Sequence, residues 1–269
     1  MLKTRILTAL LLLVVFLLAV FLLPEKFFAV AVAVVVWFAV REWSLLLKMQ
    51  RVQGVILQTV IALLVLAFGL ADDSKHSAVL LTLIYLGAFS FWWATAPAFM
   101  YIYEPIEKGY WGYMTGVMIF VPVAVAFLEL RHAGPWILLA AMAPIWLADI
   151  AAYSVGRAFG RHKLAPTISP GKSWEGVWGG LAAVIIYALV LRAFVPALAG
   201  HVGVFVTLLI AAFYAAMSVV GDLFESMMKR HAGVKDSGTL LPGHGGILDR
   251  IDSLLPTLPL AGALLLWMR

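Results

Sequence analysis

ILTALLLLVVFLLAVFLL, residues 6–23, is an uncharged and almost wholly apolar stretch of eighteen residues that follows the charged start Met1–Arg5. The apolar region of a secretory signal peptide holds only about 7–15 residues, whereas a helix needs about 20 apolar residues to cross a bilayer. We therefore predict that this stretch is a retained membrane-spanning helix.

Eight further stretches have the same character. The chain of 269 residues is 64% hydrophobic and only 12% charged, with a mean hydropathy of +1.02, whereas soluble proteins average about 25% charged residues. The sequence predicts an all-α polytopic membrane protein with about nine spans, the others being residues 28–45, 54–71, 78–98, 112–130, 136–157, 176–196, 202–227 and 253–268.

The distribution of basic residues predicts the orientation. With the N-terminus in the cytoplasm, 14 of the 19 basic residues fall on the inner side, and the outer side keeps Lys26, Lys75, Arg131, Arg192 and Arg269. This bias follows the positive-inside rule. We expect a location in the cell inner membrane with the functional site facing the cytoplasm.

Polar residues are concentrated in the second half of the chain. Residues 1–135 are predicted to form a hydrophobic scaffold, and residues 136–269 a catalytic region with cytoplasmic loops at 157–176 and 229–252. The absence of cysteine excludes disulfides, thiol catalysis and cysteine-bound metals.

Several carboxylates lie within or next to the apolar segments. They are Asp149 in IWLADIAAY, Asp222 and Glu225 in VVGDLFES, and Asp249 and Asp252 in DRID. Each ionised group costs roughly 2.5–3.5 kcal/mol at a bilayer centre, so we expect these side chains to face a polar cavity or an interface. One interpretation is helix-end acids that pair with Lys229, Arg230 and Arg250; the other is a site for Mg²⁺, which prefers oxygen ligands.

Cations lie close to these acids in the sequence. Lys172, Lys229, Arg230, Lys235 and Arg250 could neutralise a polyphosphate. The glycines of PGHGG, residues 242–246, would let backbone N–H groups approach a phosphate, while His244 is either a ligand contact or a structural residue. Acids for a metal and bases for phosphates together indicate phosphoryl or nucleotidyl transfer.

Gly171-Lys172-Ser173 resembles part of a P-loop. That motif needs a glycine where this chain has Pro166, and no strand of a soluble domain precedes it, so we reject it. Lys172 is then either a phosphate contact at a helix start or a membrane anchor beside Trp174.

The pattern S-x2-KR-x4-KD-x5-PGHGG-x2-DR-x-D spans Ser226 to Asp252 and specifies thirteen positions in 27 residues. It resembles the signature of the phosphatidate cytidylyltransferases, and the resemblance extends over roughly residues 140–255 through SPGKSWEG and the Asp149 region. Asp149 departs from the family pattern because Ile-Ala-Ala-Tyr follows it, where the family tends to have a small hydroxyl residue or glycine. The role of the Asp149 segment therefore stays open.

The resemblance implies an enzyme that converts CTP and phosphatidate to CDP-diacylglycerol and pyrophosphate with Mg²⁺. It also implies a possible monovalent cation such as K⁺, a homodimer in the lipid bilayer, and no nucleic-acid partner. We expect Asp222 and Asp249, with Asp149 as a weaker candidate, to bind the metal. Catalytic roles are expected for Lys229, Arg230, Arg250, Ser226 and Lys172, and substrate contacts for Lys235, His244, Gly245, Gly246 and Lys172. Glu225, Asp236 and Asp252 are expected to orient the basic groups.

Two other functions use similar ingredients. One is a related CTP-dependent enzyme or a CDP-alcohol phosphotransferase, and the latter would carry the pattern DGx2ARx8Gx3Dx3D, which this chain lacks. An ion-coupled transporter would place its polar residues near the bilayer midplane between repeated halves, and no inverted repeat is evident.

Overall fold

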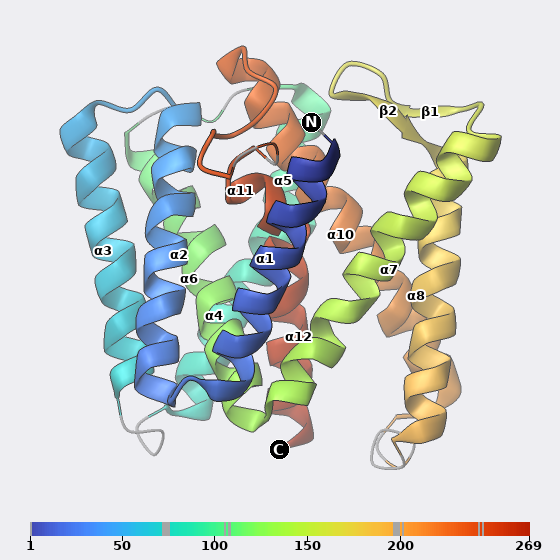
Figure 1. Ribbon diagram of the computed structural model, residues 1–269, viewed down its shortest axis with the longest axis horizontal. Helices are drawn as coiled ribbons and strands as arrows, with labels where there is room; N and C mark the ends of the chain where they lie inside the picture. Colours follow the sequence, from blue (N-terminus) through green and yellow to red (C-terminus); the bar gives the residue numbers. More distant parts are fainter. Residues whose placement is uncertain are drawn as a thin grey trace.

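The computed structural model describes residues 2–71, 76–104, 106, 109–195, 200, 202–241, 243 and 245–269, with side chains from residue 8 onward. Most of these residues are helical (Figure 1). The elements are α1 (Leu2–Leu22), α2 (Glu25–Leu46), α3 (Arg51–Leu70), α4 (Ala78–Ser90), the π-helical turn η2 (Phe91–Thr95), α5 (Ala96–Ile102), α6 (Tyr110–Ala133), α7 (Pro135–Phe159), β1 (Lys163–Ala165), β2 (Ser169–Ser173), α8 (Trp174–Phe194), α10 (Val204–Ala232), α11 (Leu248–Ile251) and α12 (Leu254–Met268).

Each of the nine predicted apolar segments coincides with helix to within a few residues, which confirms the all-α, multi-pass membrane architecture. Among the described residues, seven helical stretches are long and apolar enough to cross a membrane, with α4, η2 and α5 forming one of them. The apolar parts of α1 and α12 are shorter. Nine crossings and a cytoplasmic N-terminus remain predictions.

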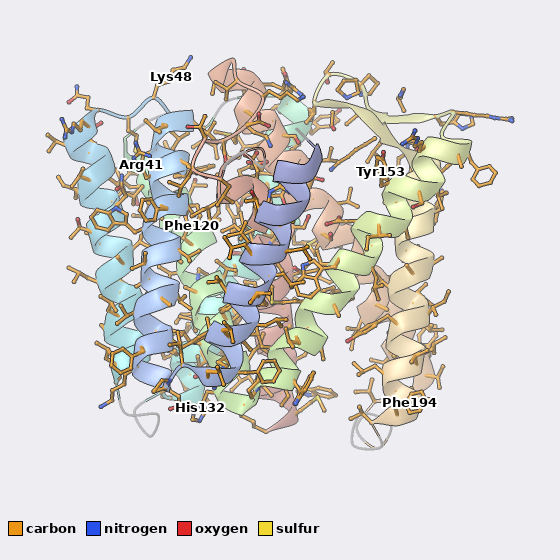
Figure 2. All side chains as sticks on the ribbon, in the orientation of Figure 1. Arg41, Lys48, Phe120, His132, Tyr153 and Phe194 are labelled. Atoms are coloured by element: carbon orange, nitrogen blue, oxygen red, sulfur yellow. The ribbon has the colours of Figure 1, made fainter. Side chains whose placement is uncertain are left out.

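The two ends of the molecule differ in charge. Arg41 and Lys48 lie at the end that carries β1 and β2, whereas His132 lies at the opposite end (Figure 2). The chain termini also lie at opposite ends (Figure 1), as an odd number of crossings requires. The segments rich in basic residues thus share one end of the bundle.

Both polar segments contain more regular structure than the sequence predicted. Residues 163–173 form an antiparallel hairpin in which Lys163 pairs with Ser173 and Ala165 with Ser169. The predicted start of the second loop at residue 229 is wrong, because α10 continues through Ala232 and ends at Gly233 with φ of 80°. Cations in the last turn of a helix interact favourably with its dipole, and glycine readily takes the left-handed conformation that ends it.

An aromatic cluster fixes the rotation of α10. Phe224 is buried and packs with ring centroids 6.2 Å from Trp43 of α2, 5.6 Å from Phe91 and 5.5 Å from Trp92. Residues two apart lie roughly 200° apart around a helix. With Phe224 held in the core, Asp222 therefore points to the opposite side of α10.

Helices α7 and α8 pack closely along a seam of small residues. A Cβ atom at Gly176 would lie 2.9 Å from the carbonyl oxygen of Ala152, and one at Gly180 would lie 3.2 Å from that of Ala148. Small residues four apart let membrane helices approach closely. The pair stands at one flank of the bundle (Figure 1) and packs onto α10 mainly through α8.

We predict that Gly176→Ala destabilises the protein by about 1–3 kcal/mol, since the added methyl overpacks a backbone contact. Gly87→Ala is the matched control, because a Cβ atom there meets nothing within 4 Å, and alanine raises helix propensity by about 1 kcal/mol. The measurement is thermal unfolding of the purified protein in detergent, followed by circular dichroism. A Gly176→Ala protein as stable as Gly87→Ala would show that the seam is not tightly packed.

Candidate active site

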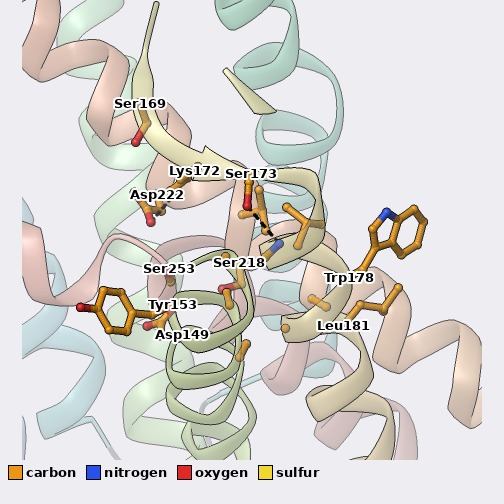
Figure 3. Close-up of a pocket in the computed structure, with 18 of the residues that line it drawn as sticks. Asp149, Tyr153, Ser169, Lys172, Ser173, Trp178, Leu181, Ser218, Asp222 and Ser253 are labelled. Carbon is orange, nitrogen blue, oxygen red and sulfur yellow. Dashed lines mark hydrogen bonds and ion pairs between the residues drawn. The ribbon is translucent and has the colours of Figure 1, made fainter. Parts of the chain in front are cut away.

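A cavity of about 720 Å³ lies between α7, β2, α8 and α10, below the hairpin (Figure 3). One wall is apolar and includes Val177, Trp178 and Leu181 of α8. The opposite region is polar and collects ionisable side chains from four segments: Asp149, Lys172, Asp222, Asp249 and Asp252. The cavity therefore brings together acids that are up to 103 residues apart in the sequence.

Lys172 and Asp222 form an ion pair within this cavity. The Lys172 Nζ atom lies 2.5 Å from Asp222 Oδ2, and both side chains are partly exposed to the cavity (Figure 3). Ser226, one turn further along α10, donates a hydrogen bond to Asp222 Oδ1 at 3.3 Å. Asp149 of α7 lines the same cavity.

Asp249 accepts hydrogen bonds at both carboxylate oxygens. Lys229 Nζ donates to Oδ1 at 2.7 Å, and the backbone N–H groups of Ser237 and Gly246 donate to Oδ2 at 2.9 and 2.8 Å. Burial raises the pKa of Asp249, but these hydrogen bonds outweigh it and hold the pKa below its usual range. Asp249 is therefore a persistent negative charge at the edge of the cavity.

Asp252 lies one helical turn beyond Asp249, and its pKa is shifted in the opposite direction. Burial, and then the charge of Asp222, raise the pKa of Asp252 to about 7. Its carboxylate accepts a hydrogen bond from the N–H of Ser253 at 2.7 Å. The expectation that Asp252 orients a basic group has no ion pair to support it among the described residues.

Lys229 lies between two carboxylates. Its Nζ atom is 2.5 Å from Glu225 Oε2 and 2.7 Å from Asp249 Oδ1, and only 13% of the side chain is exposed. Lys229 does not line the cavity. Glu225 was expected to orient a basic group, and it forms an ion pair with Lys229. Lys229 in turn forms an ion pair with Asp249.

The other predicted residues surround this centre. Arg230 is exposed, and its Nε atom donates to the carbonyl oxygen of Ile168 in the hairpin at 3.2 Å. Lys235, Asp236 and Arg250 are exposed at the same end. Gly245 has φ of 79°, and Gly246 is buried against Asp249. His244 lies outside the described residues.

Among the polar residues that the sequence did not single out, two lie behind the cavity, next to the segment that holds Asp249. Glu42 of α2 is only 2% exposed and accepts hydrogen bonds from the N–H groups of Ile247 and Leu248. Ser237 lies between Glu42 and Asp249, with its Oγ atom 3.0 Å from each carboxylate. The position of this carboxylate in the apolar stretch AVREWSLL is the signal that indicates a polar role for Glu42.

The acids fit a magnesium ion in part. Among the described residues, no three His, Asp or Glu side chains come together as a ready-made metal site. Mg²⁺, however, is usually held by one or two carboxylates together with substrate phosphates and water. Asp149, Asp222, Asp249 and Asp252 all line the cavity and offer oxygen ligands only, so one or two of them would meet this requirement.

Comparison with known proteins identifies the family. The model of the cytidylyltransferase family matches residues 3–268. The chain belongs to this family. It is 41% identical over 273 residues to a phosphatidate cytidylyltransferase of Pseudomonas aeruginosa, covering 98% of this chain and 97% of that protein. It is 35% identical over 280 residues to the phosphatidate cytidylyltransferase of Haemophilus influenzae, covering 96% of each chain.

A third relative matches a shorter region. The phosphatidate cytidylyltransferase of Staphylococcus epidermidis is 41% identical over 170 residues, which covers 61% of this chain and 64% of that protein. Membership of the cytidylyltransferase family confirms a CTP-using nucleotidyltransferase, and it removes the transporter from consideration.

We predict that Lys229→Met destabilises this cytidylyltransferase by about 3–5 kcal/mol, because the change leaves Glu225 and Asp249 buried side by side without a counter-charge. Adding Glu225→Gln should restore part of the loss, since one of the two charges is then removed. The control is Lys163→Met at an exposed hairpin position, with an expected change within about 0.5 kcal/mol. The measurement is thermal unfolding in detergent, and equal stability of the two single variants would contradict a structural role for Lys229.

Proposed function

We propose that the protein is a phosphatidate cytidylyltransferase of the cell inner membrane, which makes CDP-diacylglycerol and pyrophosphate from CTP and phosphatidate at the cytoplasmic face. The observation that carries this proposal is the shared cavity of Asp222, Asp249 and Lys172, with an apolar wall beside it. Family membership and the names of the relatives support the choice of substrates.

The reaction needs positioning and charge neutralisation. A phosphate oxygen of phosphatidate attacks the α-phosphorus of CTP, a new P–O bond forms, and the bond to the β-phosphate oxygen breaks to release pyrophosphate. The attacking oxygen is already anionic near neutral pH, so the protein has no nucleophile to supply and no proton to remove. Its task is to hold two polyanions in line and stabilise charge on the leaving group.

Basic residues at the cavity supply this stabilisation. Lys172 of β2 and Arg157 of α7 both line the cavity, where they would contact a phosphate. Arg230, Lys235 and Arg250 are exposed at the same end, where they would attract CTP and then pyrophosphate. The contact of Arg230 with the hairpin carbonyl of Ile168 would keep this cation close to Lys172.

Asp222 and Asp249 would hold Mg²⁺, which neutralises phosphate charge when it is bound. Each carboxylate is paired with a lysine, Lys172 and Lys229 respectively, so the protein alone already balances much of the negative charge. Asp149 and Asp252 line the same cavity. We propose that one of them contributes to a monovalent cation site beside Mg²⁺.

The cavity wall accounts for a lipid substrate. Trp178, Leu181 and Val177 line the cavity from α8, and Trp178 and Ile186 of the same helix are 61% and 62% exposed. A lipid could keep its acyl chains in the bilayer beside α8 while its phosphate reaches the polar region. We further propose that two copies associate in the membrane, which mass measurement in lipid nanodiscs would test.

We predict that the purified protein in detergent converts labelled CTP and phosphatidate to a CDP-lipid only in the presence of Mg²⁺. Chelation by EDTA should abolish the product, and excess Mg²⁺ should restore it. A protein that is folded yet makes no CDP-lipid under these conditions would refute the proposed function. Full activity after chelation would refute the metal requirement.

We also predict that Asp222→Asn and Asp249→Asn each lower kcat by about 100-fold or more, a loss typical of removing a group that stabilises transition-state charge. The control is Glu25→Gln, which neutralises a carboxylate that is 59% exposed and paired with His132 at the opposite end. Glu25→Gln should retain activity within about threefold. The assignment of Asp222 and Asp249 fails if either Asn variant matches this control.

A further inference from the structure

Glu42 is a carboxylate from the N-terminal scaffold that lies against the polar segment of the second half. It belongs to α2, near Arg41 at the hairpin end of the molecule (Figure 2), and it is only 2% exposed. Its Oε1 atom accepts a hydrogen bond from Ile247 N at 3.0 Å, and its Oε2 atom accepts one from Leu248 N at 2.8 Å. The carboxylate thus binds the backbone at the start of α11.

The segment is shaped to fit this carboxylate. A Cβ atom at Gly238 would lie 2.5 Å from Glu42 Oε1, and a Cβ atom at Gly246 would collide with both Glu42 Oε2 and Ser237 Oγ. Only glycine leaves room for the carboxylate at these two positions. The buried carboxylate of Glu42 therefore explains why residues 238 and 246 are glycines.

The same segment also holds Asp249. Ser237 and Gly246 donate their backbone N–H groups to Asp249 Oδ2 at 2.9 and 2.8 Å. The Ser237 Oγ atom lies 3.0 Å from Glu42 Oε2 and 3.0 Å from Asp249 Oδ2. A hydroxyl has one proton, so Ser237 donates to one carboxylate at a time and links the two.

We propose that Glu42 is a positioning residue for the cytidylyl transfer: it anchors the segment from Ser237 to Leu248 so that Asp249 faces the cavity and pairs with Lys229. This inference rests on the proposed function. Glu42 does not line the cavity, so it does not touch the substrates and acts through Asp249. A residue of the N-terminal scaffold would thereby influence the reaction by positioning Asp249.

Glutamine is the informative substitution at this position. A carboxylate accepts hydrogen bonds at both oxygens, whereas the amide of glutamine has one acceptor oxygen and an NH₂ group that can only donate. In Glu42→Gln, the NH₂ group would face one of the two backbone N–H donors. The segment should therefore loosen although the side-chain volume is almost unchanged.

The control is Glu129→Gln. Glu129 is a buried scaffold carboxylate of α6, 6% exposed, and it pairs with Arg269 at 2.8 Å. It lies three residues before His132, at the end of the molecule opposite the cavity (Figure 2). The two substitutions make the same chemical change at similar burial, and only one of them is next to the site.

The experiment compares both variants with the unchanged protein in lipid nanodiscs. We expect Glu42→Gln to lower kcat by about 10–100-fold, the loss typical of a group that orients a ligand, with KM for CTP within about threefold. Backbone hydrogen exchange over residues 237–249 should become faster. Glu129→Gln should change neither kcat nor this exchange, even where it lowers thermal stability.

The proposal is overturned if Glu42→Gln retains the kcat of Glu129→Gln, or if exchange over residues 237–249 is unchanged. Should Glu42→Gln fail to fold, Gly238→Ala places a Cβ atom 2.5 Å from Glu42 Oε1 and displaces the carboxylate from its backbone donors; it should lower kcat in the same direction, and an unchanged kcat overturns the proposal. Absence of CDP-lipid from the unchanged protein would instead refute the proposed function. The exchange measurement would then still decide whether Glu42 anchors the segment.

Discussion

Carboxylates in an apolar helix bundle must be paired with cations or hydrogen-bond donors. This requirement accounts for the arrangement of polar residues at one end of the molecule. Asp222 is paired with Lys172, Asp249 with Lys229, and Glu225 with the same lysine. Glu42 pairs with no cation among the described residues and is satisfied by two backbone N–H groups and a hydroxyl. An unpaired ion in such surroundings costs several kcal/mol. The polar segments are therefore the partners of the acids as well as connections between helices.

Packing sets the direction in which each acid points. Phe224 is held among Trp43, Phe91 and Trp92, and this fixes Asp222 on the cavity side of α10. The small-residue seam fixes α7 against α8, which brings Asp149 and the hairpin to the same cavity. The packing of apolar residues between the helices thus also determines which charged side chains face the cavity.

The helices and half of the site were predictable because their signals are local. Apolar length identifies a span without knowledge of its neighbours, and Asp222, Asp249 and Lys172 stand in short polar motifs. The contacts of Glu42 with Ser237 and Leu248 join residues 195 and 206 positions apart, and no local pattern specifies such a pair. The extension of α10 to Ala232, by contrast, follows local signals, namely the cations of its last turn and Gly233. The contacts of Glu42 depend on tertiary pairing, which a single sequence does not display.

The hairpin that carries Lys172 is tied down on three sides. Glu175 accepts hydrogen bonds from the N–H groups of Arg161 and His162 before β1, Arg230 holds the turn at Ile168, and Ser173 caps α8. Since the hairpin is also the covalent link between two helices in close contact, we expect it to move together with them. An incoming anion would then compete with Asp222 for Lys172. The lysine side chain would rotate from one partner to the other, and the hairpin itself would not have to open.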